Sequence, residues 1–356
     1  MSRNQTLLAG LAAAVMVTVG VGNATRATAA DITFSGSGGV VAKYTKQVYN
    51  EPFTKETGIK IKRVGAEAKR MVQLEAMVKA GKVIWDAMEV SASDYPIGVR
   101  KGLFEEIDYS KVDPDNKLPA AARKKYGVGY AAWSQILAVR TDKLPAGKQM
   151  KTWADFWNVE EFPGPRALRG RPQDNLEFAL LADGAEKQDL YKILGTKEGV
   201  DRAFKKLDEI KPHIVTWWKS GAQSVQLLSD GEIHYGTSYN GRITKIAASG
   251  VPTEIVWEGG ALHLSFVSVP KGSKHIEEAF MFAKYRTLDP KRMRDYITHL
   301  PYPGFAPGLY DGLDPKVAMT LPTSEANIKA QFSADEVFWS ENIDAIQERW
   351  TEWLLE

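Results

Sequence analysis

Short apolar runs alternate with amphipathic segments along most of the chain. In the first third, this pattern predicts strands at residues 31–35, 59–64 and 83–90 and helices at residues 40–57 and 67–80. In the second of these helices Met71, Leu74 and Val78 lie on one face, and Gly81 follows as a helix stop. An order of strand, helix, strand, helix, strand is typical of a parallel sheet covered by helices, so the predicted fold class is α/β.

The rest of the chain holds a second series of the same kind. Residues 152–158 open it. The pattern predicts helices near residues 174–183, 186–195, 198–210 and 240–249, strands near 213–218 and 233–238, and closing helices near 275–286, 289–298 and 341–355. Two longer apolar runs, 128–140 and 262–269, separate this series from its flanking segments. Each run is long enough to cross between two bodies, so we predict two lobes, one of them discontinuous in sequence. Such proteins bind ligands in the crevice at the carboxyl ends of the strands.

The first thirty residues have a different pattern. Arg3 precedes an apolar run from Leu7 to Val21, and small residues continue to Ala30. This is the order of a secretory signal peptide. As a helix, the apolar run would span about 22 Å, which is short of the ~30 Å hydrocarbon core of a bilayer. We therefore expect cleavage near Ala30 and export of the remainder to a bacterial periplasm.

Charge and composition remove several classes of function. The chain has 46 Lys and Arg and 44 Asp and Glu, and the expected signal peptide contains Arg3 and Arg26 but no acid. The exported part is therefore neutral, whereas nucleic-acid-binding proteins usually carry a basic excess. The chain has no cysteine, which excludes disulfides, thiolate metal ligands, cysteine nucleophiles and a lipid-modified N-terminal cysteine.

Residues 35–39, Ser-Gly-Ser-Gly-Gly, follow the first predicted strand and open the first predicted helix. A dinucleotide-binding loop requires Gly-x-Gly-x-x-Gly or Ala and an acidic residue about 20 residues later. Here Val41 stands at the last position, and the next strand ends in Lys62, Arg63 and Val64. We interpret the loop as backbone that faces a crevice, where a helix N-terminus favours an anion. A tight turn without a ligand is the alternative.

No catalytic motif stands out in the sequence. The chain lacks the Gly-x-Ser-x-Gly elbow and the phosphate-binding Gly-x-x-x-x-Gly-Lys-Ser/Thr pattern. Its histidines do not have the spacing of metal ligands; they are His213, His234, His263, His275 and His299. We therefore expect no catalytic residue, no metal and no cofactor.

Several stretches nevertheless resemble a known family. They are Trp85 to Ser91, Gly102 to Asp108, Thr152 to Trp157, Leu227 to Ile233, Tyr239-Asn240-Gly241 and Glu258-Gly259-Gly260-Ala261. In order and spacing, over nearly the whole exported chain, these stretches resemble the periplasmic solute-binding proteins of ABC importers, in the spermidine/putrescine-binding branch. The resemblance implies a type II periplasmic-binding-protein fold, capture of a small solute by lobe closure, and delivery to a permease and its ATPase in the inner membrane.

The resemblance also implies a division of the chain. After a signal peptide at residues 1–30, lobe 1 would comprise residues 31–135 and 265–356, including the C-terminal helices, and lobe 2 would comprise residues 136–264. The two crossing strands would join the lobes, with the ligand cleft between them. We expect a monomer that binds no nucleic acid.

The family's ligand residues carry over only in part. Polyamine binders have aromatic and acidic residues where this chain has Ser35 to Gly39, and Arg171 stands where one family carboxylate would fall. Asp174 matches a second carboxylate and would be left to meet an amine. An Arg fork suits a carboxylate or phosphonate, whereas a buried ammonium without carboxylate partners is costly. We therefore predict a small organic anion or zwitterion as the ligand.

The remaining candidates come from the same comparison and, for Trp218 and Arg242, from their positions at a strand end and after Tyr239-Asn240-Gly241. Tyr239 replaces a stacking tryptophan of the family, and either Trp217 or Trp218 is expected in the core. The full set of predicted ligand-binding residues is Ser35, Gly36, Ser37, Gly38, Gly39, Ser91, Ser93, Arg171, Asp174, Trp218, Tyr239, Arg242, His263 and Ser265. A polyamine-binding protein and an exported enzyme on the same scaffold remain as alternative functions.

Overall fold

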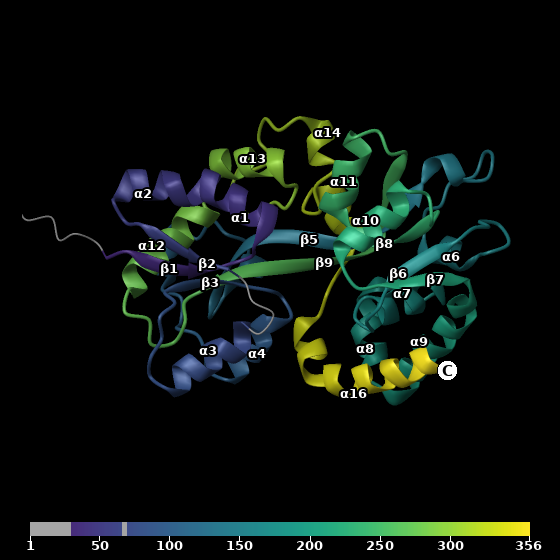
Figure 1. The fold of residues 1–356 in the computed structure, drawn as a ribbon, viewed down its shortest axis with the longest axis horizontal. Helices are drawn as coiled ribbons and strands as arrows, with labels where there is room; N and C mark the ends of the chain where they lie inside the picture. The colour runs from purple at the N-terminus through teal and green to yellow at the C-terminus, as the bar shows by residue number, and fades with distance from the viewer. Residues whose placement is uncertain (1–29, 66–69) are drawn as a thin grey trace, which may run out of the picture.

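The computed structural model describes residues 30–65 and 70–356 and divides into two lobes that lie side by side (Figure 1). The predicted signal peptide and the first residues of the predicted helix at 67–80 lie outside the described residues. In each lobe, helices cover both faces of a central sheet (Figure 1). The prediction of a two-lobed α/β fold is confirmed.

Lobe 1 is built on a parallel sheet in which β1 pairs with both β2 and β3. Its elements are β1 (Ile32–Ser35), α1 (Gly39–Thr45), α2 (Glu51–Thr57), β2 (Ile61–Val64), α3 (Arg70–Lys79), β3 (Ala87–Val90), α4 (Asp94–Arg100), α5 (Tyr109–Val112), β4 (Arg123–Lys124), α12 (Ile276–Thr287) and α13 (Pro290–His299). The single helix predicted at 40–57 is interrupted by a π-helical segment at Lys46–Asn50. The strand predicted at 83–90 begins only at Ala87. Phe34 and Phe53 are fully buried against Phe282 of α12 and centre the core of this lobe.

Lobe 2 repeats the arrangement with β6 between its parallel neighbours β7 and β8. Its elements are α6 (Trp153–Trp157), β6 (Arg166–Arg169), α7 (Asn175–Ala182), α8 (Leu190–Leu194), α9 (Lys197–Ile210), β7 (Ile214–Trp218), α10 (Gly221–Ser229), β8 (Tyr235–Tyr239) and α11 (Asn240–Ala248). In α6, Thr152 and Asp155 form a reciprocal capping box. Trp153 and Phe178 stack at the centre of the core, with ring centroids 3.8 Å apart.

Two long strands, β5 (Gly127–Arg140) and β9 (Thr253–Ser268), join the lobes. They pair with each other, β9 also pairs with β3 of lobe 1, and β5 also pairs with β8 of lobe 2, so one sheet runs through the molecule. The crossing predicted at 128–140 matches β5. The second crossing begins at Thr253 rather than 262, because residues 257–260 bulge out of the pairing and separate two stretches of one strand. Gly259 has a left-handed backbone (φ 68°), which suits glycine at this bulge.

The C-terminal segment contains α14 (Pro315–Ala318), α15 (Glu325–Ala330), β10 (Phe332–Ser333) and α16 (Glu336–Leu355). The sequence predicted that the C-terminal helices pack on lobe 1, but α16 packs on lobe 2. Its Trp350 and Trp353 pack edge-on to Trp217, with ring centroids 5.3 Å and 5.5 Å away, and join the core cluster of that lobe. The N-terminal turns of α16 also meet α4, where Arg100 donates a 2.9 Å hydrogen bond to the carbonyl of Ser340. The chain therefore returns to lobe 2 after the second crossing.

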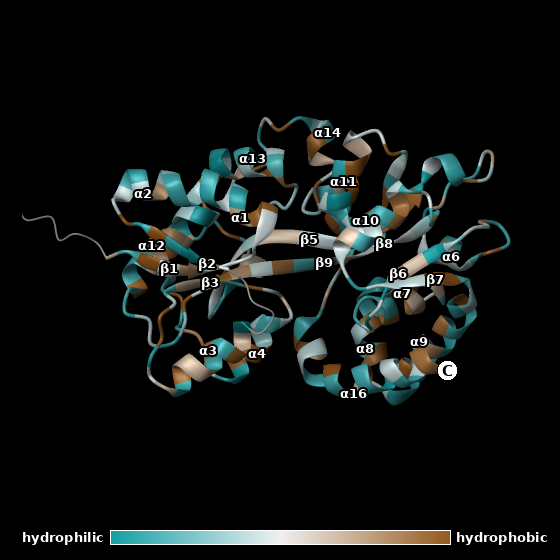
Figure 2. Ribbon diagram, in the orientation of Figure 1, coloured by the Kyte–Doolittle hydropathy of each residue, from teal (hydrophilic) through white to brown (hydrophobic). Residues whose placement is uncertain are grey.

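Apolar and polar residues are distributed as expected for a globular protein. In Figure 2 the outward turns of the helices are mostly hydrophilic, while apolar colour recurs along the strands and the helix faces toward them. Within residues 30–65 and 70–356, no helix combines the length and the hydropathy needed to cross a membrane.

The packing of α16 makes a testable claim. Trp350 is fully buried, so Trp350→Ala should lower the free energy of unfolding by about 3–5 kcal/mol, as truncation of a buried aromatic does. Urea titration followed by circular dichroism measures the change. Val337→Ala is a matched control on the same helix, because Val337 is 57% exposed. Equal, small effects of the two changes would contradict the placement of α16 in the lobe 2 core.

Candidate ligand-binding cleft

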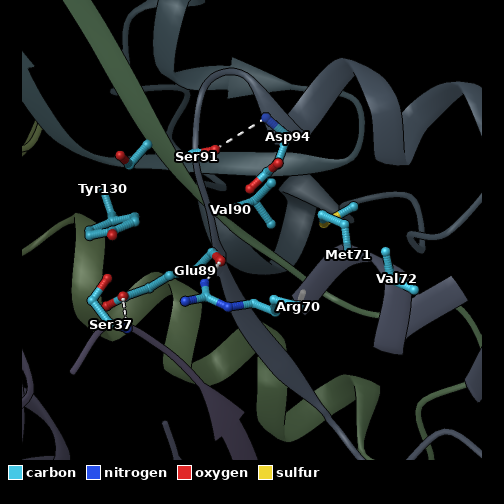
Figure 3. Close-up of a pocket in the computed structure, with 10 residues that line it drawn as sticks. Ser37, Arg70, Met71, Val72, Glu89, Val90, Ser91, Asp94 and Tyr130 are labelled. Atoms are coloured by element: carbon cyan, nitrogen blue, oxygen red, sulfur yellow. Dashed lines mark hydrogen bonds between the residues drawn. The ribbon is translucent and has the colours of Figure 1, made fainter. Parts of the chain in front are cut away.

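A cavity of about 290 Å³ opens on lobe 1 beside the crossing strands (Figure 3). It lies at the carboxyl end of β3, between the N-terminal ends of α3 and α4. Its lining residues are Ser37, Arg70, Met71, Val72, Glu89, Val90, Ser91, Asp94, Tyr130 and Ser265. The structure thus brings together three predicted residues from distant segments, Ser37, Ser91 and Ser265. The volume suits a small solute.

The glycine-rich loop faces an internal carboxylate. The backbone N–H of Ser37 donates to Glu89 Oε2 at 2.6 Å, and the N–H of Gly36 donates to the carbonyl of Val64 at 3.2 Å. Burial would raise the pKa of Glu89, but Arg286 and Arg63 outweigh burial and hold this pKa below its usual value. Two N–H groups that the sequence offered to a ligand anion are therefore already bonded within the protein.

The other members of this predicted loop have different environments. Ser35 is fully buried in β1, whereas Gly38 and Gly39 are exposed. The backbone carbonyl of Ser37 accepts a hydrogen bond from the guanidinium of Arg63. Of the five residues, Ser37 is the one that lines the cavity.

Polar groups at the start of α4 and just before it form the opposite side of the cavity (Figure 3). Ser91 Oγ accepts a 3.1 Å hydrogen bond from the backbone N–H of Asp94 and lies 3.1 Å from Ser93 Oγ. Ser93 is exposed and does not line the cavity. The carboxylate of Asp94 has no ion-pair partner among residues 30–65 and 70–356. Asp94, which the sequence did not single out, is therefore a carboxylate at the cavity without an ion-pair partner among the described residues.

A chain of charged groups continues from the cavity into lobe 2. In β9, His263 precedes Ser265 by two residues and lies on the same face, and its Nε2 lies 2.9 Å from Asp174 Oδ1. Arg171 Nη2 donates to Asp174 Oδ2 at 2.8 Å, and His263 Nδ1 lies 2.9 Å from Glu336 Oε1. The structure thus joins three predicted residues, Arg171, Asp174 and His263. The expectation that Asp174 is left for a ligand amine is corrected, because both of its oxygens have partners within the protein.

Burial and charge shift the protonation of this network. Burial would lower the pKa of His263, but Asp174 and Glu336 outweigh burial and raise it to about 9. Burial would raise the pKa of Asp174, and His263 and Arg171 instead hold it well below its usual value. The neighbouring Glu177 accepts from Trp339 Nε1 at 2.6 Å, and burial, together with the charge of Asp174, raises its pKa to about 8. At neutral pH His263 is a cation and Glu177 is neutral.

Arg169, at the carboxyl end of β6, is a cation that the sequence did not single out. Its guanidinium carbon lies 5.5 Å from the ring centroid of Trp218 and 5.4 Å from that of Tyr239, and Nη1 donates to Gln135 Oε1 at 3.3 Å. Among the described residues no carboxylate lies within ion-pair distance of it. Burial lowers the pKa of Arg169 to about 10, and the charge of Arg171 adds to this effect. Arg169 is therefore a partly buried guanidinium that lacks an ion-pair partner in the described part of the chain.

The remaining candidates differ in exposure. Trp218 is fully buried and bonded through Nε1 to Thr237 Oγ1 at 3.0 Å, so in this conformation it offers a ligand no exposed surface. Tyr239 is partly exposed and packs edge-on to Trp133, with centroids 5.2 Å apart. Arg242 is exposed, and its Nε lies against Gly221, where an added Cβ would come within 2.7 Å. In the described part of the chain no group of His, Cys, Asp and Glu has the arrangement of a metal site.

Two lobes joined by crossing strands, with a small polar cavity beside the crossing, define a solute-binding protein. The sequence profile of the bacterial extracellular solute-binding proteins matches residues 49–323. The chain belongs to that family and acts as the substrate-binding component of an ABC transporter, working with a membrane permease. Family membership also implies a periplasmic location.

Individual relatives agree with this assignment. The chain is 36% identical to the gamma-aminobutyric acid-binding protein of Pseudomonas aeruginosa over 93% of its own length and 92% of the relative's. It is 24% identical to spermidine/putrescine-binding periplasmic protein 1 of Haemophilus influenzae over 71% of its own length and 70% of the relative's. These relatives are solute-binding proteins, not enzymes.

Solved structures resemble the whole described fold. An ABC transporter substrate-binding protein from Bradyrhizobium japonicum superposes with a TM-score of 0.82 at 34% identity, covering 91% of this chain and 99% of that one. A GABA receptor superposes with a TM-score of 0.80 at 34% identity, covering 91% of this chain and 97% of that one.

The buried network predicts a pH dependence of stability. Raised pKa values mean that folding favours the protonated forms of His263 and Glu177, so their stabilisation is present at low pH and is lost as pH rises. For His263 the loss falls between its ordinary value of 6.5 and about 9. The free energy of unfolding should therefore decrease across this window, as measured by urea titrations at several pH values. His263→Gln should flatten the slope, and an unchanged slope would contradict the assigned protonation.

Proposed function

We propose that this protein captures a small amino-acid-like zwitterion, with a carboxylate at one end and an ammonium group at the other. The single observation that carries the proposal is the guanidinium of Arg169, which is partly buried and has no carboxylate partner in the described chain. A desolvated cation of this kind gains most from an anion supplied from outside the protein. The two relatives near 35% identity that are named for gamma-aminobutyric acid support the same ligand class.

The charges of the lobe 2 wall support an anionic group there. Arg169, Arg171 and protonated His263 supply three positive charges, and Asp174 and Glu336 supply two negative charges. Glu177 contributes none while its pKa stays near 8. The excess of one positive charge favours a ligand carboxylate and opposes a ligand ammonium at this end.

Asp94 supports the placement of the ammonium group at the other end. Its carboxylate lines the cavity beside the hydroxyl of Ser91, which can also accept a hydrogen bond from an ammonium N–H. A ligand bound between Asp94 of lobe 1 and Arg169 of lobe 2 would contact both lobes. Such contacts exist only in the closed form and would shift the protein toward closure.

We also propose how the mature protein is made and how it passes on its solute. The exported protein is a soluble monomer without a lipid anchor, made with a signal peptide that is removed near Ala30. It delivers its solute to a permease driven by an ATPase, and it carries out no chemistry on the solute. A polyamine ligand is the alternative; the excess positive charge of the lobe 2 wall argues against it.

Calorimetry with matched variants tests the ligand class. The wild-type protein should bind gamma-aminobutyric acid or a related amino acid and should bind 1,4-diaminobutane far more weakly. Arg169→Met should weaken binding of the amino acid roughly 10- to 100-fold, as loss of a charged hydrogen-bond partner worth about 1.5–3 kcal/mol does. Arg202→Met, on the exposed face of α9, is the control and should leave affinity unchanged. Tight diamine binding that survives Arg169→Met would refute the proposal.

Asp94→Asn tests the other end of the ligand. This change keeps the shape of the side chain but removes the charge that would pair with the ligand ammonium, so affinity for the amino acid should fall about tenfold. The affinity for a carboxylate analogue that lacks the amine should change little. Equal losses for both ligands would mean that Asp94 acts on the fold of α4 rather than on the amine.

A further inference from the structure

Asp174 is a fully buried carboxylate, and each of its oxygens is ion-paired inside the protein. Oδ1 is paired with His263 Nε2 at 2.9 Å and Oδ2 with Arg171 Nη2 at 2.8 Å. The two partners come from different segments, His263 from β9 and Arg171 from the loop before α7. A ligand ammonium could reach Asp174 only by displacing one of these cations and leaving it unpaired, which is costly in a buried site.

The geometry around His263 favours its charged form. Its two ring nitrogens each lie 2.9 Å from a carboxylate oxygen, of Asp174 on one side and of Glu336 on the other. A neutral imidazole has one N–H donor, so with both carboxylates ionised the two contacts are hydrogen bonds only in the imidazolium form. The ring also stacks on Trp133 with centroids 4.2 Å apart and planes 9° apart. The cation is therefore held by β5, β9, α16 and the start of α7 together.

The backbone conformation of Asp174 is independent evidence that surrounding contacts hold this residue in place. Asp174 has φ 70°, in the left-handed region that non-glycine residues rarely occupy. Residues in such conformations are strained and persist only where surrounding contacts hold them. Here the contacts that hold the side chain are the two internal cations.

We propose that His263 and Arg171 are built-in counter-cations that occupy Asp174 and so determine the specificity of the cleft, excluding a second ammonium group from the lobe 2 end. A ligand with one amine can place it at lobe 1, whereas a diamine has no available carboxylate at lobe 2. This inference rests on the proposed zwitterion site, and it identifies the residues that restrict which ligands the site accepts. His263 acts here as a positioning residue that neutralises Asp174 and fixes its geometry.

The charge of His263 can be read directly in the wild-type protein. In a two-dimensional ¹H–¹⁵N spectrum optimised for histidine rings, at pH 7.5, His263 should show two protonated ring nitrogens, with His263→Gln identifying its signals. A single protonated nitrogen would overturn the proposal. This measurement uses no ligand, so it is independent of whether the protein binds an amino acid.

Diamine binding tests the consequence. Arg171→Gln combined with His263→Gln removes both cations while leaving neutral groups of similar reach, so Asp174 should take an ammonium and affinity for 1,4-diaminobutane should rise about tenfold or more over wild type. Adding Asp174→Asn should abolish the gain. Each single variant frees one oxygen of Asp174 and should show a smaller gain, which keeps the test available if the double variant is unstable. Folded variants that gain no diamine affinity would refute the specificity role, whereas loss of amino-acid binding by Arg169→Met tests the proposed function separately.

Discussion

The antiparallel pairing of β5 with β9 is the constraint on which the rest of the structure depends. The two strands are the longest in the described chain and run through both lobes, so the lobes share one sheet. Pairing of Trp133 with His263 and of Ala131 with Ser265 fixes which side chains face the cleft. Because side chains alternate along a strand, a shift of one residue would turn His263 and Ser265 away from the cleft together. The register of one strand pair therefore aligns the lobe 1 cavity with the lobe 2 charges.

Pairing with β9 also brings the C-terminal segment back to the cleft, so the lobes are connected by α16 as well as by the two crossing strands. After β9 the chain builds α12 and α13 on lobe 1, then returns through β10, which pairs with β9, and ends in α16 on lobe 2. The start of α16 places Glu336 against His263 and Ser340 against Arg100 of lobe 1. One helix thus contacts the core of one lobe, the charged network of the cleft and a helix of the other lobe. If the lobes move relative to each other, α16 must change its contacts with the lobe 2 core, with the charged network or with α4.

The alternation of apolar and polar residues predicted the α/β class, the two lobes and most helices and strands, because each of these depends on local periodicity. It failed where distant contacts decide the outcome. The placement of α16 depends on Trp350 meeting Trp217, which follows from no local pattern. Arg169 passed unnoticed because its aromatic neighbours come from β7 and β8, and Glu89 because its bond to Ser37 joins residues far apart in sequence. Asp174 was recognised as part of the site, but the partners of its carboxylate come from β9 and the preceding loop.

Internal ion pairs account for the charges that remain available to a solute. In lobe 1, Glu89 takes the N–H of Ser37 and is paired with Arg286, so the glycine-rich loop has an internal anion where an external one was expected. In lobe 2, Asp174 is paired with two cations of the protein, where the sequence predicted a ligand ammonium group. Each pairing satisfies a group that would be costly to bury alone. After these pairings, Asp94 at the lobe 1 cavity and Arg169 in lobe 2 have no ion-pair partner among residues 30–65 and 70–356. A solute with one amine and one carboxylate is the ligand whose charges complement both.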